Sequence, residues 1–229
     1  MNGTINARLP FVPQAVFFDL DGTLADTARD LAEPVNAMRA ERGLTPLPLA
    51  DLRPFSSMGA RGLIGKGLGV EREDPSFESL KNDFLARYER AMCVHTRLFD
   101  GMARVLQTLD DAGIAWGVVS NKVERYVRPI MAELGLLQRA VAAVGGDTTA
   151  FTKPHPEPLL YAARLGAVQP ERCIYVGDDL RDVQAGQAAG MFTVAAAYGY
   201  CGDSSPADWG ADLLIERPVE LLALFAARG

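Results

Sequence analysis

The sequence predicts an α/β fold in which a doubly wound parallel sheet carries an inserted helical domain. From Leu98 onward, apolar runs of strand length alternate with amphipathic runs of helical length, a pattern typical of parallel crossovers. Those strand-like runs are apolar throughout, as expected of strands covered by helices on both faces. A separate strand-like run at residues 15–18 is followed by a long segment with helical patterns only. We therefore predict a Rossmann-like core of residues 1–25 and 98–229 and an α-helical cap of residues 26–97.

Two amphipathic segments define the predicted cap. Leu31, Val35 and Met38 recur at helical spacing, and Pro34 within this pattern predicts a kink because proline lacks a backbone donor. Three prolines then divide residues 46–54 into short pieces. A second long helix is expected to begin at residues 74–75, where an aspartate precedes a proline, and to end before Thr96.

The core elements follow in regular alternation after the cap. The predicted helices cover residues 102–112, 123–134, 156–165 and 182–189, with a closing helix from Pro218. The predicted strands cover residues 114–119, 140–144, 173–176, 193–197 and 213–215. Because ligands bind beyond the carboxyl ends of such strands, the polar residues that end them are the candidate site.

Composition and charge exclude several classes of function. The chain has 229 residues, of which 48% are hydrophobic and 23% charged, as in globular proteins. A formal charge of −6 argues against a nucleic-acid partner. No membrane-spanning apolar run or signal-peptide core is evident, so we expect a soluble cytoplasmic protein with no membrane partner. Its three cysteines form no metal-binding spacing. The oligomeric state stays open.

The most informative stretch is Phe17 to Thr27, FFDLDGTLADT. Asp19 and Asp21 follow the first strand, and side chains two residues apart on extended backbone point to the same side. Two neighbouring carboxylates repel each other unless a cation neutralises them or one is protonated. An acidic turn with no further function is the structural alternative, because Asp and Gly are common turn residues.

Two later strand ends supply groups that suit a phosphate. Ser120 and Asn121 are uncharged donors in WGVVSNK, although both residues are also common helix caps. Lys153 precedes a proline in FTKPHPEPLL and could neutralise an anion, although most single lysines are solvated.

The fourth strand ends in VGDDLRD, which gathers Asp178, Asp179 and Asp182. Three carboxylates at one strand end need a cation among them, and oxygen ligands suit a hard divalent ion such as Mg²⁺.

The ordered set DxDGT, S-N, K-P and GDxxxD resembles the four motifs of the haloacid dehalogenase superfamily, in its phosphatase branch. The resemblance implies that Asp19 is the nucleophile that forms an aspartyl-phosphate, and that Asp21 protonates the leaving oxygen and then activates water. It implies that Asp182 orients Lys153 or a metal-bound water, and it leaves the role of Asp179 open. The implied Mg²⁺ ligands are Asp19, the backbone carbonyl of Asp21, and Asp178. The implied phosphate-binding residues are Ser120 and Lys153, with Thr23 and Asn121 nearby.

Over almost the full chain, the arrangement resembles the phosphoglycolate phosphatases of that superfamily. Within that branch, HTRLFDGM, WGVVSNK and the tail from YGYCGD to DWGAD are especially similar to the N-acetylmuramic acid 6-phosphate phosphatases. The expected substrate is therefore a small carboxylated phosphometabolite such as 2-phosphoglycolate, with N-acetylmuramate 6-phosphate as the alternative. A sugar phosphomutase shares all four motifs but must return the phosphoryl group instead of giving it to water, and it is a further, less favoured alternative. A dehalogenase and an inactive binding module are less consistent with the motifs. Arg61, in a glycine-rich cap segment, could bind the substrate carboxylate, although a solvated surface role is equally consistent with its position. We expect the cap to move on hinges near residues 24–27 and 94–101.

Overall fold

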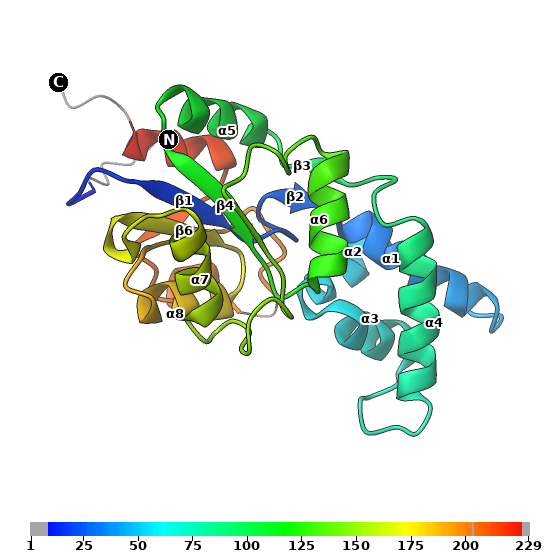
Figure 1. Cartoon of the computed structure of the whole chain (residues 1–229). Helices are drawn as coiled ribbons and strands as arrows, with labels where there is room; N and C mark the ends of the chain where they lie inside the picture. The colour runs from blue at the N-terminus through cyan, green and yellow to red at the C-terminus, as the bar shows by residue number, and fades with distance from the viewer. Residues whose placement is uncertain (1–8, 203, 226–229) are drawn as a thin grey trace.

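In a computed structural model of the chain, which describes residues 9–202 and 204–225, six parallel strands form one sheet in the order β5-β4-β1-β6-β7-β8 (Figure 1). The strands are β1 (Ala15–Phe18), β4 (Ala115–Val119), β5 (Ala142–Val144), β6 (Cys173–Gly177), β7 (Phe192–Ala196) and β8 (Leu213–Ile215). The chain runs outward from β1 in one direction, then returns to β6 and runs outward in the other. The order therefore reverses between β1 and β6, and a crevice is expected beyond the carboxyl ends of these two strands. The predicted α/β class is confirmed.

Helices cover both faces of the sheet. On one face lie α5 (Met102–Asp111), α6 (Glu124–Glu133) and the 3₁₀ helix η4 (Pro218–Leu224), whereas α7 (Glu157–Leu165) and α8 (Leu180–Ala188) cover the other. Successive residues of β1 enter different cores: Val16 and Phe18 pack with the first group of helices, and Ala15 and Phe17 with the second. This two-sided burial accounts for the continuous apolar runs in the sequence.

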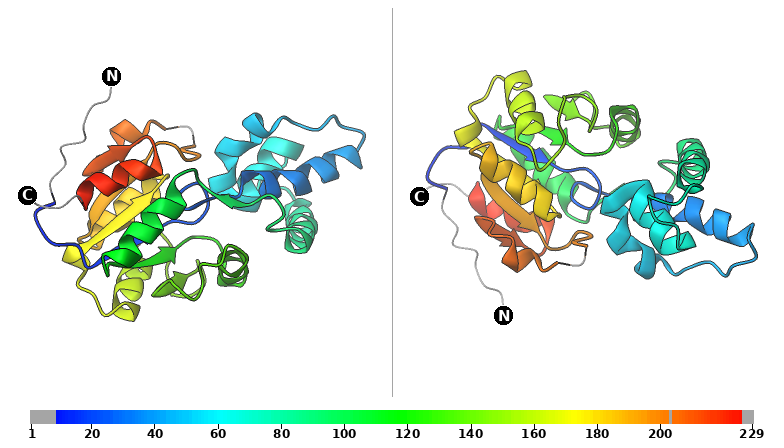
Figure 2. Two further views of the ribbon diagram at one scale, coloured as in Figure 1. Left: turned by 90° about the horizontal axis from the view of Figure 1, so that it is seen from above. Right: turned by 90° about the horizontal axis from the view of Figure 1, so that it is seen from below.

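A second lobe, which we call the cap, consists of α1 (Ala28–Ala40), α2 (Leu49–Leu52), η1 (Arg53–Met58), α3 (Gly59–Leu68) and α4 (Phe77–Arg90) (Figure 2). These helices pack around an apolar core of their own, which includes Leu31, Val35, Met38, Phe84 and Tyr88. The proline-rich stretch forms short helices.

The two connections between the lobes run side by side. β2 (Ala25–Asp26) pairs antiparallel with β3 (Arg97–Leu98), so that Ala25 lies opposite Leu98 and Asp26 opposite Arg97. Arg53 of the cap forms a salt bridge of 2.8 Å with Asp26. Both chain connections to the cap thus pass through one short two-stranded ladder.

Helix α1 contains Pro34 and continues to Ala40. Two local details differ from the sequence-based expectation, and the first is that the closing helix is of the 3₁₀ type. Asp74 does not cap α4 directly; its carboxylate accepts hydrogen bonds from the backbone and hydroxyl of Ser76, one residue before the helix begins. Within the described residues, no helix is both long enough and apolar enough to cross a membrane.

Candidate active site

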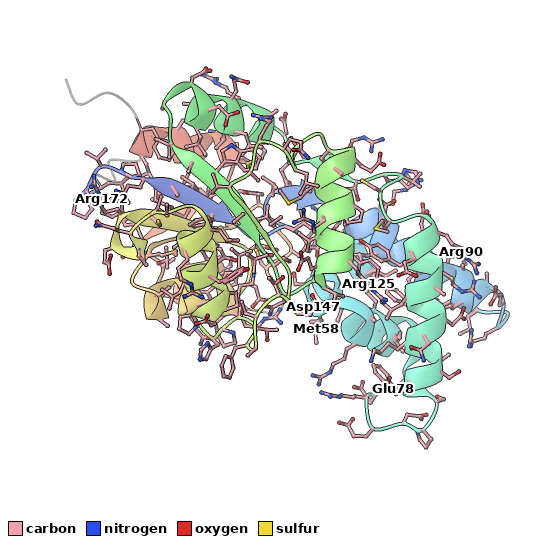
Figure 3. The ribbon with its side chains drawn as sticks, viewed as in Figure 1. Met58, Glu78, Arg90, Arg125, Asp147 and Arg172 are labelled. Atoms are coloured by element: carbon pink, nitrogen blue, oxygen red, sulfur yellow. The ribbon has the colours of Figure 1, made fainter. Side chains whose placement is uncertain are left out.

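The polar strand ends border one cavity of about 310 Å³ between the core and the cap. Its wall on the core side contains most of the residues that the sequence indicated: Asp19, Asp21, Ser120, Asn121, Lys153, Asp179 and Asp182. The cap contributes the end of η1, the start of α3 and one face of α4. Figure 3 labels Met58, which belongs to the cap wall, and Arg125 at the start of α6. Because the strand ends meet at one edge of the sheet, the cavity brings together residues that are far apart in the sequence.

An acidic cluster lies at the reversal point of the sheet. Carboxylate oxygens of Asp19, Asp178 and Asp182 lie within 4.8 Å of one another. Asp178 accepts hydrogen bonds from the Thr23 hydroxyl at 2.7 Å and from the Tyr200 backbone at 2.8 Å. Burial, together with the charges of Asp19 and Asp182, raises the pKa of Asp178 well above its usual range. This donor set fits a hard divalent cation, which would offset the repulsion.

Gly22 is required at the turn between these carboxylates. Its φ of 85° lies in the left-handed region that favours glycine. A Cβ atom at this position would lie 2.1 Å from Oδ2 of Asp178. Any other residue would therefore strain the backbone and displace Asp178.

Lys153 brings a buried positive charge to the cluster. Its Nζ lies 2.6 Å from Asp182 Oδ1 and 3.1 Å from Asp19 Oδ1, and it donates a hydrogen bond to the hydroxyl of Tyr175 at 2.9 Å. Burial alone would lower the pKa of this ammonium, but the two carboxylates raise it. Lys153 is thus held protonated against Asp19.

Asn121 positions Lys153 through two hydrogen bonds to its backbone. Its Oδ1 accepts a hydrogen bond from the Lys153 backbone at 2.9 Å, and its Nδ2 donates to the Lys153 carbonyl at 3.0 Å. The Thr23 hydroxyl donates its hydrogen bond to Asp178. Both residues support side chains that line or border the cavity.

The carboxylate of Asp21 is directed away from the acidic cluster. Asp19 and Asp21 therefore both line the cavity, but only Asp19 belongs to the cluster. Lys122 Nζ donates to both of its oxygens, at 2.7 and 2.8 Å, and the Thr27 hydroxyl donates at 2.5 Å. Only the backbone carbonyl of Asp21 is left for the implied metal role.

Lys122 is a site residue that the sequence reasoning missed. Its side chain is 8% exposed and lines the cavity, and Asp21 raises its pKa despite the opposing effect of burial. The available signal was its position directly after Ser120 and Asn121 at a strand end. Ser120 also lines the cavity, and its hydroxyl accepts a hydrogen bond from the Lys122 backbone at 3.3 Å.

Asp179 holds a second missed residue, Arg181. The Asp179 carboxylate accepts hydrogen bonds from the backbone and guanidinium of Arg181, while Asp182 accepts from the Asp179 backbone in a capping box at the start of α8. The same guanidinium donates to the Ser57 carbonyl at 3.1 Å. Arg181 therefore links the core to the cap.

Arg61 does not reach this cavity. It is exposed on α3, whose next three residues, Gly62, Leu63 and Ile64, turn inward and are buried. The structure thus leaves Arg61 in its solvated surface position.

The cap wall of the cavity does not include Arg61, but it contains three hydroxyl groups. The hydroxyls of Ser56, Ser57 and Tyr88 are buried without a hydrogen-bond partner among the described residues. Each unpaired buried hydroxyl costs about 1–3 kcal/mol. Burial also raises the pKa of Tyr88 to about 12, so this hydroxyl stays neutral. The wall is therefore suited to a polar ligand.

A family model described as haloacid dehalogenase-like hydrolase matches residues 16–196, which is most of the chain. The chain belongs to this family. It is 47% identical over 210 residues to a phosphoglycolate phosphatase of Xanthomonas campestris pv. campestris, covering 91% of this chain and 95% of the relative. It is 41% identical over 210 residues to an N-acetylmuramic acid 6-phosphate phosphatase of Pseudomonas aeruginosa, covering 91% and 93%.

Among solved haloacid dehalogenase-like structures, one from Haemophilus somnus, described as a predicted phosphoglycolate phosphatase, superposes with a TM-score of 0.80 at 25% identity. It covers 93% of this chain and 98% of that one. The family and fold expected from the four motifs are confirmed, and the similar curated proteins are named as phosphatases.

Proposed function

We propose that this protein is a Mg²⁺-dependent phosphomonoesterase that hydrolyses a small carboxylated phosphometabolite through an aspartyl-phosphate on Asp19. The observation that carries the proposal is the position of Asp19, which lines the cavity 3.1 Å from Lys153 and within the same cluster as Asp178. A nucleophile that attacks a dianionic phosphate needs positive charge beside it. The relatives named as phosphatases support the same reaction class.

The residues present fit Mg²⁺ because they offer hard oxygen donors in a cluster of three carboxylates, whose negative charge Lys153 neutralises only in part. The carboxylates of Asp19 and Asp178 and the backbone carbonyl of Asp21 would hold it. When bound, the ion neutralises charge on the phosphoryl group and lowers the barrier to attack by an anion.

Asp19 acts as the nucleophile in the first step. Its Oδ1 accepts a hydrogen bond from the Leu20 backbone at 2.7 Å, which helps to fix the carboxylate rotamer. A carboxylate oxygen forms a bond to phosphorus as the bond from phosphorus to the leaving oxygen breaks. Lys153 and Ser120 supply donors to the phosphoryl oxygens. Dividing hydrolysis into two displacements makes each of them easier.

Asp21 serves as the acid and then as the base. In its protonated form it gives a proton to the leaving alcohol, and it then takes a proton from the water that attacks the aspartyl-phosphate. Thr27 and Lys122 hold its carboxylate on the side of the cavity that faces the cap. This second step releases inorganic phosphate and restores Asp19.

Two carboxylated substrates merit direct comparison. The relatives' names point to 2-phosphoglycolate and to N-acetylmuramate 6-phosphate. The cavity has a volume of about 310 Å³, and sites for small organic ligands begin at about 300 Å³. Its wall also contains three unpaired hydroxyls. Both features are compatible with the larger, hydroxylated amino-sugar acid, which is therefore the second candidate.

The test is to measure kcat/KM for both esters with Mg²⁺, following free phosphate and the dephosphorylated product. Release of free phosphate from either ester supports the proposal. A phosphate isomer formed without free phosphate would indicate a mutase, and no turnover of either ester or of an aryl phosphate would contradict the proposal. We also propose that the enzyme acts in the cytoplasm, which cell fractionation can test.

A further inference from the structure

We propose that Lys122 is a specificity-determining residue that binds a carboxylate on the leaving group of the substrate, in a subsite shared with the hydroxyls of Tyr88 and Ser57. This role rests on the proposed phosphatase function. It assigns to Lys122 the contact with the substrate carboxylate that the sequence had suggested for Arg61.

The position of Lys122 places it on the leaving-group side of the reaction. Its Nζ lies 2.7 Å from the Asp21 oxygen atom Oδ1, and Asp21 is the group assigned to protonate the leaving oxygen. The carboxylate of 2-phosphoglycolate, whose carbon is two bonds from that oxygen, therefore lies within reach of the ammonium, whereas the carboxylate of N-acetylmuramate 6-phosphate lies farther along the leaving group. Lys153, the other lysine in the wall, is engaged by Asp19 and Asp182 instead.

The hydrogen bonds of Lys122 leave room for a ligand. An ammonium has three donors, and two of them are directed to the Asp21 oxygens. The Nζ atom also lies 5.1 Å from the centroid of the Tyr88 ring, on the cap. The third donor lies near the Tyr88 hydroxyl, whose electrostatic interaction with the ammonium, together with that of Asp21, raises the pKa of Lys122 against the effect of burial.

The neighbouring hydroxyls point to the same kind of ligand. Tyr88 is 1% exposed, and the hydroxyls of Tyr88, Ser56 and Ser57 are buried without partners among the described residues, in the wall of this cavity. Hydroxyl donors and one ammonium together match a carboxylate, whose oxygens accept several hydrogen bonds.

Arg181 is the competing cation in the cavity, but its position is less suitable. Both Asp179 oxygens and the Ser57 carbonyl already accept hydrogen bonds from its guanidinium, and its side chain is 37% exposed. It is fixed as a link between the lobes.

The test uses two pairs of esters that differ in a carboxylate. These are 2-phosphoglycolate against 2-hydroxyethyl phosphate, and N-acetylmuramate 6-phosphate against N-acetylglucosamine 6-phosphate. We expect the wild type to prefer the carboxylated member of at least one pair, and Lys122→Met to reduce that ratio of kcat/KM values at least tenfold. Because the ratio is the readout, any common loss of rate cancels.

Controls keep the outcome interpretable. Lys122→Arg should restore part of the preference, Tyr88→Phe should reduce it less than Lys122→Met, and Lys81→Met, on the exposed side of α4, should leave it unchanged. If Lys122→Met does not fold, as judged by circular dichroism, the same ratio of kcat/KM values is measured for Lys122→Arg and Tyr88→Phe, and a reduced ratio in these variants supports the inference.

Two results would overturn the inference: equal use of both members of each pair by the wild type, or loss of the preference in Arg61→Met with its retention in Lys122→Met. If none of the four esters releases phosphate, the proposed function itself fails, which is a distinguishable result.

Discussion

The hydroxyl of Thr27 donates a hydrogen bond of 2.5 Å to Oδ1 of Asp21, and so connects the first residue before helix α1 to the proposed acid of the core. The Tyr200 hydroxyl in turn accepts a hydrogen bond from the Thr27 backbone at 2.8 Å, while the Tyr200 backbone donates to Asp178. The connection to the cap and both acidic groups therefore belong to one hydrogen-bonded network.

Thr27→Val should lower kcat by about tenfold or more, because a hydrogen bond to a charged group contributes about 1.5–3 kcal/mol. Valine keeps the shape of threonine, so the fold should persist. Steady-state kinetics should show little change in the Mg²⁺ concentration needed for half-maximal rate. Thr108→Val, which removes an exposed helix hydroxyl, is the matched control. A wild-type kcat in Thr27→Val would exclude this contact from catalysis.

Asp19→Asn should reduce phosphate release by at least about 10³-fold, because an amide cannot serve as the attacking oxygen. Asparagine keeps the size of the side chain, and circular dichroism and a melting curve should confirm that the protein folds. Mass spectrometry of quenched wild-type enzyme should detect a phosphorylated Asp19, which the variant should lack. Turnover at the wild-type rate would refute the nucleophile assignment.

Asp178→Ala should raise the Mg²⁺ concentration for half-maximal rate by more than about tenfold, since a direct ligand matters at least as much as groups that support ligands. Asp178→Asn, which still offers an acceptor to Thr23, separates the loss of charge from the loss of this contact. Titration of activity with Mg²⁺ gives both values. An unchanged metal dependence in both variants would remove Asp178 from the ligand set.

Asp110→Asn should destabilise the core without affecting the reaction. Partial burial raises the pKa of Asp110, but hydrogen bonds from Arg139 and Trp116 outweigh it and hold the pKa below its usual value. The stabilisation is therefore fully present above the unfolded value, near pH 4, and is lost as the pH falls through the lower folded value.

For this partly exposed pair we expect a loss of about 1 kcal/mol or less at pH 7, which should shrink below pH 4. Urea unfolding at several pH values, followed by circular dichroism, measures it, and kcat should be unchanged. A difference that does not vary with pH would contradict the assignment.

The arrangement of the core could be predicted because its signals are local. Apolar runs define strands, and the rule for parallel crossovers then brings strand ends such as Asp19, Ser120 and Asp178 to one edge of the sheet. The polar partners of these residues are not local. Lys122 bonds to a residue 101 positions earlier, and Thr23 to one 155 positions later. Spacing along the chain carries no information about such pairs.

The cap shows a second limit. The segment around Arg61 contains glycines and apolar residues whose helical face cannot be assigned from spacing alone, and the side of α3 that faces inward is decided by packing against α1 and η1. Arg61 therefore had two equal interpretations in the sequence, and only the burial of its neighbours separates them. Asn121 was likewise ambiguous, because an amide serves a backbone as readily as a ligand.

The adjacent pairing of β2 and β3 has a consequence for how such proteins diversify. Because the chain leaves the core at Asp26 and re-enters it at the opposite residue, Arg97, the intervening block begins and ends at nearly the same point. A block of another length or shape could be exchanged there without altering the register of the six-stranded sheet. Selection for new metabolites can thus act on a replaceable module, while the half that transfers the phosphoryl group is inherited intact.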